Sequence, residues 1–482
     1  MRLFIFFSLA LLLPFSTLHA ETKKADHLFA TGSLRTASYS IYAIDAQSGE
    51  VVLESAQKSL STASVMKLFT TAVSLEILGP GYTFSTRLFR SGTLDPNTGI
   101  LNGDLILCGG GDPAFYSSWF EDQYKGCFEN WVSQLKDSGI RKINGNLLLD
   151  LSFAGHAMIP GGWVWEDIGN YYGAGVSALT FKDNQYEIHL SSPAAAGMQV
   201  TIMSILPGIA GLLPENRVKS SLQSGDHTII YNAPGSNHPV IEGTIPVSQP
   251  DFVIKASMPE PPIVAGLDFM QKLKEGGVEI SGDIRKLTNA DEKVRTLVAS
   301  QLSPPLKELI VPLNKESLNL FAEHLLCEIG RVKYGESSTE KGIEALHQFC
   351  RDNRIDTLGF FPTDGSGLSR SNALTAKTLV EMIRLMNESP FRDTFFNSLP
   401  VAGIDGTLRN SFKGTPLEKN VIAKTGSMAR VRSLAGKLTT KNQKNIFFAI
   451  LINNFDLTSA EASKLLESIL LSLYNDVKPP KQ

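Results

Sequence analysis

The chain has 482 residues, of which 43% are apolar and 19% are charged, and its formal net charge at pH 7 is −3. This length exceeds one ordinary domain and supplies enough apolar residues for more than one packed core. The near-neutral balance provides no broad basic surface, so nucleic acid and anionic lipid are not expected as partners.

The amino-terminal 20 residues have the pattern of a cleavable signal peptide. Arg2 precedes the apolar run Leu3–Leu13, and the segment ends in Leu18-His19-Ala20. The run is too short for a membrane-spanning helix, which needs about 20 apolar residues. We therefore predict cleavage after Ala20 and export to the periplasm.

The next two segments predict a β-hairpin followed by a helix. Residues Tyr39–Glu54 alternate around the turn Asp45–Gly49, as in a hairpin at the edge of a sheet. Residues Ser64–Leu78 precede the helix-stopping pair Gly79-Pro80. Apolar side chains recur in this second segment at helical spacing, at Met66, Phe69, Val73 and Ile77. Ser64 is therefore expected at the start of a helix.

The middle of the chain, residues 83–287, consists of short apolar runs separated by Gly, Pro, Asn and Asp clusters. We interpret it as a β-rich insertion, long enough for two subdomains. The flanking segments 21–82 and 288–482 would then form one discontinuous domain that carries the motifs described below.

The carboxy-terminal segment predicts two strands and a helix. Ser433–Leu438 and Ile446–Asn453 have the composition of strands, and Thr458–Tyr474 has that of a helix. Thr458 and Glu461 can form a capping box at its start. If these strands join the amino-terminal hairpin in one sheet, the two ends of the chain must meet.

The four cysteines do not form a disulfide framework typical of a small secreted domain. In an oxidising compartment Cys108 can pair with Cys127, and Cys327 with Cys350, but the sequence does not determine connectivity. We find neither C-x-x-C nor H-E-x-x-H, so no metal is expected.

The first of three short motifs is Ser64-Val65-Met66-Lys67. Residues i and i+3 share a helix face, so the Lys67 amine can reach the Ser64 hydroxyl and, when neutral, act as its base. Free lysine titrates near ~10.4, and burial or a second cation such as Lys424 would lower that pKa. N–H groups at a helix start, that of Ser64 included, favour negative charge on an attacked carbonyl oxygen. Taken alone, the motif is more often an ordinary helix with a solvated lysine.

The second motif, Ser317-Leu318-Asn319, precedes a predicted helix. Ser317 placed between Lys67 and Lys424 can relay a proton to a leaving amine. The Asn319 amide can bind a substrate backbone group or orient Lys67. A plain capping role for Ser317 is the alternative.

The third motif, Lys424-Thr425-Gly426-Ser427, follows three apolar residues and predicts an edge strand facing a cleft. Gly426 permits close approach of another backbone. Lys424 with the Thr425 and Ser427 hydroxyls suits a carboxylate, and the Ser427 N–H can serve as a second oxyanion donor. Its alternative is an exposed turn.

The three motifs in this order are typical of penicillin-binding proteins and class A β-lactamases. The chain resembles the class C low-molecular-mass penicillin-binding proteins, the D-alanyl-D-alanine carboxypeptidase/endopeptidase family, over nearly its whole mature length. The long separation between the first two motifs is similar to that family's large insertion, which class A β-lactamases lack. Further stretches resemble the family: Gly103-Asp104-Leu105 with Gly111-Asp112-Pro113, Gly162–Asp167, Asp364–Ser369, and Leu399–Gly403 with Asp405–Leu408.

The resemblance implies an α/β (α+β) fold of the penicillin-binding/β-lactamase-like transpeptidase type, with an antiparallel sheet flanked by helices and a large β-rich insertion. It implies that Ser64 attacks D-alanine carbonyls of peptidoglycan stem peptides through an acyl-enzyme, and that β-lactams acylate the same serine. Asp167 matches a family position for an acid that receives the free amine of a peptide side chain. No metal or organic cofactor is implied, and a homo-oligomer is possible.

Two features qualify this interpretation. Leu318 is apolar where the S-D-N version of the motif is polar, which bears on substrate preference. Asp364-Gly365-Ser366-Gly367 is expected to be a structural turn, because it lacks the G-x-S-x-G pattern of a nucleophile elbow. The alternatives are a β-lactamase, for which we find no dedicated deacylating acid, and a non-enzymatic cell-wall-binding scaffold, against which the intact motifs argue.

Overall fold

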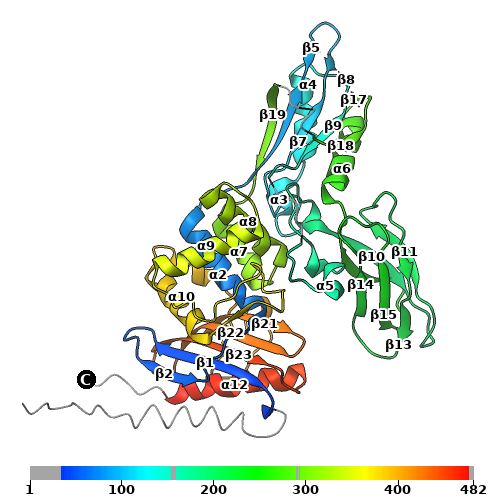
Figure 1. Cartoon of the computed structure of the whole chain (residues 1–482). Coiled ribbons are helices and arrows are strands. Elements are labelled where there is room, and N and C mark those ends of the chain that lie inside the picture. The colour runs from blue at the N-terminus through cyan, green and yellow to red at the C-terminus, as the bar shows by residue number, and fades with distance from the viewer. Residues whose placement is uncertain (1–33, 154–158, 289–290, 292–293, 477–482) are drawn as a thin grey trace, which may run out of the picture.

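The structure, a computed structural model, describes residues 34–153, 159–288, 291 and 294–476 (Figure 1). The predicted signal peptide, residues 1–20, lies outside the described residues. Within the described ranges, no helix has the length and apolar character needed to cross a membrane.

The segments on either side of the middle region contribute one group of strands and helices. In chain order they are β1 (Ser38–Asp45), β2 (Val51–Ser55), β3 (Leu60–Ser61), α2 (Lys67–Leu78), α7 (Leu306–Lys315), α8 (Asn319–Tyr334), α9 (Thr339–Asp352), β20 (Ala373–Leu374), α10 (Ala376–Glu388), α11 (Arg392–Asn397), β21 (Val421–Met428), β22 (Val431–Thr439), β23 (Asn445–Asn453) and α12 (Ser459–Asp476).

The middle region contributes a second group. These are β4 (Ser85–Ser91), β5 (Thr93–Asp95), β6 (Ile100–Asn102), β7 (Leu105–Cys108), α3 (Glu121–Tyr124), α4 (Cys127–Asp137), β8 (Lys142–Ile143), β9 (Leu147–Asp150), α5 (Trp165–Ile168), β10 (Gln185–Ser191), β11 (Thr201–Leu206), β12 (Glu215–Asn216), β13 (Lys219–Ser221), β14 (His227–Tyr231), β15 (Val240–Pro246), β16 (Phe252–Ser257), α6 (Pro261–Glu275), β17 (Glu279–Ile280), β18 (Ile284–Lys286) and β19 (Arg295–Leu302).

A five-stranded antiparallel sheet with the order β2-β1-β23-β22-β21 joins the two ends of the chain. In Figure 1 the blue amino-terminal strands lie beside the orange and red carboxy-terminal strands. The predicted hairpin, the two predicted carboxy-terminal strands and their shared sheet are therefore confirmed. The predicted capping box is also present, because Thr458 and Glu461 exchange side-chain-to-backbone hydrogen bonds at the start of α12.

Helices cover both faces of this sheet. Alternate side chains of a strand point to opposite faces. In β23, Phe447 and Leu451 pack in the core that also contains Phe69 of α2, whereas Phe448 packs in the core that contains Leu466 of α12. The predicted α+β architecture, an antiparallel sheet flanked by helices, is thus confirmed.

The middle region is rich in strands, as predicted, and its strands fall into two groups in Figure 1. One group contains the sheets β18-β9-β7-β4-β19 and β17-β8-β6-β5. The other contains β11-β10-β16 and a sheet built around β15. The helices α4 and α6 were not expected there. Because β19 pairs with β4, the first sheet extends past the predicted bound at residue 287.

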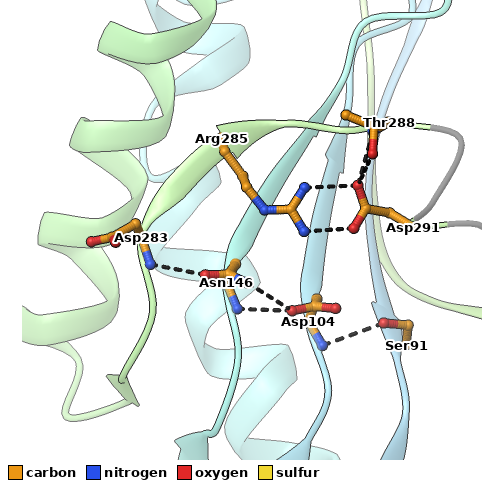
Figure 2. Close-up of polar contacts among 7 residues, drawn as sticks. All are labelled: Ser91, Asp104, Asn146, Asp283, Arg285, Thr288 and Asp291. Carbon is orange, nitrogen blue, oxygen red and sulfur yellow. Dashed lines mark hydrogen bonds and ion pairs between the residues drawn. The ribbon is translucent and has the colours of Figure 1, made fainter.

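Asp104, from one of the stretches that resemble the family, ties neighbouring strand ends together (Figure 2). Its Oδ1 accepts a hydrogen bond from the Asn146 backbone N–H at 2.9 Å, and its own N–H donates to Ser91 Oγ at 3.3 Å. The Asn146 Oδ1 in turn accepts from the Asp283 N–H at 3.1 Å. This stretch therefore stabilises the insertion sheet.

All four cysteines are free and buried, so neither Cys108–Cys127 nor Cys327–Cys350 forms a disulfide in this structure. Cys127 and Cys350 pack in the apolar core. Burial raises the pKa of Cys127, Cys327 and Cys350 to about 12, which keeps these groups as thiols.

Candidate active site

Ser64 lies in a single 3₁₀ turn, Ala63–Met66, which leads directly into α2. The prediction that Ser64 opens a helix is confirmed, with a tighter first turn than expected. Ala63 has a φ of 45°, in the left-handed region, so the chain bends sharply just before the serine. The Ser64 side chain lines the main cavity of this part of the protein.

Lys67 is fully buried behind Ser64. Its Nζ lies 3.0 Å from Ser64 Oγ, 2.6 Å from Asn319 Oδ1 and 2.7 Å from the Ser366 carbonyl oxygen. A neutral amine has two N–H donors and one lone pair. The two carbonyl oxygens accept the two N–H groups, which leaves the lone pair facing the Ser64 hydroxyl.

The protonation state of Lys67 follows from its surroundings. Burial lowers its pKa from 10.5 to about 7, while the carboxyl groups of Asp364 and Glu323 act in the opposite direction. Lys424 is also buried, and burial together with the charge of Lys67 holds the pKa of Lys424 well below its usual range. Burial is thus the main reason that the neutral form of Lys67 is accessible near neutral pH.

Ser317 and Lys424 meet on the opposite side of the cavity. The Lys424 Nζ donates to Ser317 Oγ at 3.0 Å and to the Thr425 carbonyl oxygen at 2.9 Å. Ser317 lies between α7 and α8 with a φ of 64° and lines the cavity, whereas Lys424 lies behind it. Lys424 therefore acts on the cavity through its contact with Ser317.

The third motif lies on β21, the edge strand of the central sheet, as predicted. The Ala423 N–H donates outward from β21 to the Pro400 carbonyl. Because a strand repeats every two residues, the Ser427 N–H faces the same edge. The Thr425 hydroxyl donates to Thr407 Oγ1 at 2.7 Å on this edge. Hydroxyl and N–H donors of β21 are thus presented beside Ser64.

The cavity has a volume of about 520 Å³ and receives side chains from the helix starts, the sheet edge and the insertion. Among the residues that line it are Ser64, Asp167, Tyr172, Ser317, Asn319, Arg370 and Ser427. Half-buried Asp167 faces this space, and burial raises its pKa, opposed by the Tyr172 hydroxyl and by Arg370. The structure therefore brings every predicted site residue to the cavity or directly behind it.

Contacts between the insertion and the core fix this arrangement. The Asn319 Nδ2 donates to the Tyr172 carbonyl at 2.8 Å, and the Trp163 Nε1 donates to Asp364 Oδ2 at 2.9 Å. These contacts place the insertion segment 163–172 as one wall of the cavity. Sequence reasoning identified Asp167 in this segment but not Tyr172.

A second omission of the sequence analysis is Glu323, which lies beneath Lys67. It is fully buried on α8, and its carboxylate accepts hydrogen bonds from the N–H groups of Gly365 and Ser366. The predicted turn at Asp364 is confirmed, but the turn also supplies the Ser366 carbonyl that contacts Lys67. A carboxylate one helical turn after Asn319, inside an apolar helix face, was the available signal.

In the part of the chain that the structure describes, no three His, Cys, Asp or Glu side chains gather as metal ligands do.

Comparison with solved structures identifies the class of the fold. Penicillin binding protein 4 from Haemophilus influenzae matches with a TM-score of 0.79 and 23% identity, covering 94% of this chain and 99% of that one. The same protein in complex with a β-lactam matches with a TM-score of 0.74 and 22% identity, at the same coverage. The fold is that of a penicillin-binding protein.

Sequence comparison identifies the family. The family model described as D-Ala-D-Ala carboxypeptidase 3 (S13) matches residues 21–473. A D-alanyl-D-alanine carboxypeptidase from Actinomadura sp. (strain R39) is 30% identical over 426 residues, which cover 85% of this chain and 77% of that protein. The chain belongs to the D-Ala-D-Ala carboxypeptidase 3 (S13) family, which confirms the resemblance noted in the motifs.

Proposed function

We propose that this protein is a serine D-alanyl-D-alanine carboxypeptidase and endopeptidase that acts on peptidoglycan stem peptides through an acyl-enzyme. The observation that carries the proposal is the buried Lys67 amine, 3.0 Å from Ser64 Oγ with its other two contacts taken by carbonyl oxygens. An amine held in this way is placed to take the proton of the serine hydroxyl.

In the acylation step Ser64 Oγ attacks the carbonyl carbon of the penultimate D-alanine, and its proton moves to Lys67 Nζ. The carbonyl oxygen becomes an oxyanion held by the N–H groups of Ser64 and Ser427. One such donor contributes roughly 3 kcal/mol to lowering the barrier.

In the second half of this step the C–N bond breaks and the leaving amine takes a proton. Ser317, in contact with Lys424, relays that proton. The terminal carboxylate binds at the edge of β21, at the Thr425 and Ser427 hydroxyls next to Lys424. Water then hydrolyses the ester and restores the Ser64 hydroxyl.

Asp167 accounts for recognition of the peptide beyond the reacting bond. It lines the same cavity as Ser64, so its carboxylate can form an ion pair with the free amine of a peptide side chain. Burial raises the pKa of Asp167, because no cation among the described residues is fixed at short range to favour the ionised carboxylate. An incoming ammonium group would supply that positive charge.

The proposal extends to inhibition and location. β-Lactams acylate Ser64, because their strained amide presents the same carbonyl and carboxylate pattern as the peptide. The protein works in the periplasm after removal of residues 1–20.

The direct test is D-alanine release from a D-Ala-D-Ala stem peptide by the mature protein and by Ser64→Ala. The expected result is release that depends on Ser64, with penicillin blocking it. Rapid penicillin turnover with little D-alanine release would support a β-lactamase instead, and muropeptide binding without any release would support a scaffold.

A further inference from the structure

Glu323 is a buried acid that touches neither the cavity nor the serine. It follows Asn319 by one helical turn on α8 and is 0% exposed. Its Oε1 accepts from the Ser366 N–H at 2.8 Å, and its Oε2 accepts from the Gly365 N–H at 3.0 Å. A fully buried carboxylate is costly unless it is hydrogen-bonded, and two backbone donors meet that need here.

These two hydrogen bonds connect Glu323 to Lys67 through one short piece of backbone. The Ser366 residue that donates its N–H to Glu323 presents its carbonyl to the Lys67 Nζ at 2.7 Å. On the other side of the same turn, the Gly365 carbonyl accepts from Thr70 Oγ1 at 2.6 Å. The position of the Ser366 carbonyl, and hence the direction of the Lys67 lone pair, depends on both anchors.

The charged groups around Lys67 come from three elements. Glu323 lies on α8, Asp364 opens the 364–367 turn, and Lys424 comes from β21; the remaining contacts, Ser64 and Asn319, are uncharged. Burial, followed by the charge of Asp364, raises the pKa of Glu323, but both of its oxygens accept backbone N–H groups, which bind the ionised carboxylate.

We propose that Glu323 is a positioning residue for acylation, one that aims the Ser366 carbonyl at Lys67 and whose buried negative charge stabilises the ammonium group formed when Lys67 takes the Ser64 proton. This inference rests on the proposed function. In the step itself the Ser64 O–H bond breaks, a Lys67 N–H bond forms, and no other reactant is needed.

The two parts of the proposal have different kinetic signatures. Without the negative charge at position 323 the Lys67 ammonium group is less stable, so Lys67 loses its proton at a lower pH. The acidic limb of the profile of acylation rate against pH then shifts to lower pH. The plateau falls as well, because the ammonium group is less stabilised. A merely structural role lowers the plateau without moving the limb.

The experiment measures the rate of acylation by a labelled penicillin between pH 5 and 9 for the wild-type protein, Glu323→Gln and Glu323→Asp. We expect the acidic limb of the Glu323→Gln profile to lie about one pH unit lower than that of the wild-type protein. This is the smaller end of the pKa change that a nearby opposite charge causes. Glu323→Asp keeps the charge but shifts the turn, so its plateau falls by up to about 10²-fold while its limb stays in place.

Glu328→Gln is the matched control. Glu328 is equally buried on the same helix, but its carboxylate contacts Arg331 and the Tyr82 hydroxyl. Its substitution should leave the limb unmoved, even if the protein is less stable.

The outcomes separate this inference from the proposed function. If the wild-type protein forms no Ser64-dependent adduct, the proposed function fails first. If the adduct forms but Glu323→Gln keeps the wild-type limb, only the role of Glu323 is overturned. If Glu323→Gln does not fold, Glu323→Asp still decides the positioning part, because an unchanged plateau contradicts it.

Discussion

Replacement of Gly426 by alanine should separate the two oxyanion donors with a single methyl group. A Cβ atom at this position would lie 2.1 Å from Ser433 Oγ, 2.8 Å from the Thr62 carbonyl oxygen and 3.0 Å from Ala63 Cβ. Thr62 and Ala63 lead directly into Ser64, and Gly426 precedes Ser427 on β21. The glycine thus sets the distance between the nucleophile turn and the sheet edge.

The size of the effect follows from these distances. Ser433 Oγ can rotate away, but it then loses its hydrogen bond to the Thr62 carbonyl, which costs about 1 kcal/mol. Ala63 Cβ cannot rotate, and carbon atoms in contact lie about 3.5–4.0 Å apart, so the two segments must separate by about 0.5–1 Å. We expect a stability loss of about 1–3 kcal/mol from overpacking and an acylation rate lower by up to about 10²-fold.

The assay is the rate of covalent penicillin adduct formation, with urea unfolding measured on the same samples. Gly81→Ala is the matched control, because a Cβ at Gly81 meets nothing within 4 Å. The control should keep both the wild-type rate and the wild-type stability. A Gly426→Ala protein that acylates at the wild-type rate would refute the claim that this close approach positions the oxyanion donors.

Two further predictions concern substrate recognition and pH-dependent stability. Asp167→Asn should lower kcat/KM about tenfold or more for a stem peptide with a free side-chain amine, because a charge-assisted hydrogen bond is lost. An equal loss of kcat/KM for the peptide whose side-chain amine is acetylated would contradict an ion pair. Buried His324 contacts Gly111 and Thr180, and burial lowers its pKa from 6.5 to about 4. Its stabilising effect is complete above pH 6.5 and is lost as the pH falls towards 4, by about 2 kcal/mol at pH 5. Urea unfolding at pH 7.5 and 5.0 should show this loss of stability in the wild-type protein and in the exposed-site control His227→Gln, but not in His324→Gln. An unchanged loss in His324→Gln would contradict the assignment of the pH dependence to His324.

Local patterns predicted much of the framework. The hairpin at Tyr39–Glu54, the helix that begins near Ser64 and the edge strand that contains Lys424 each follow from periodicity and turn residues within a short stretch. Their common sheet was predictable because strands from both ends needed partners. The helices α4 and α6 were missed, because the glycine-rich and proline-rich composition around them favours turns.

Long-range contacts explain what the sequence did not reveal. Glu323 and the Ser366 carbonyl reach Lys67 from segments that have no motif in common with it. Lys424 was expected to face the ligand directly, yet it is buried behind Ser317, because its strand packs against the turn that precedes Ser64. Burial of this kind depends on how elements pack and is not encoded in local spacing.

The most direct test of the central claim is the intact mass of the mature protein and of Ser64→Ala after incubation with a labelled penicillin, followed by peptide mapping. The account predicts one long-lived adduct on the wild-type protein, located at Ser64, and none on the variant. An adduct on both proteins, or on neither, would contradict the assignment of Ser64 as the nucleophile.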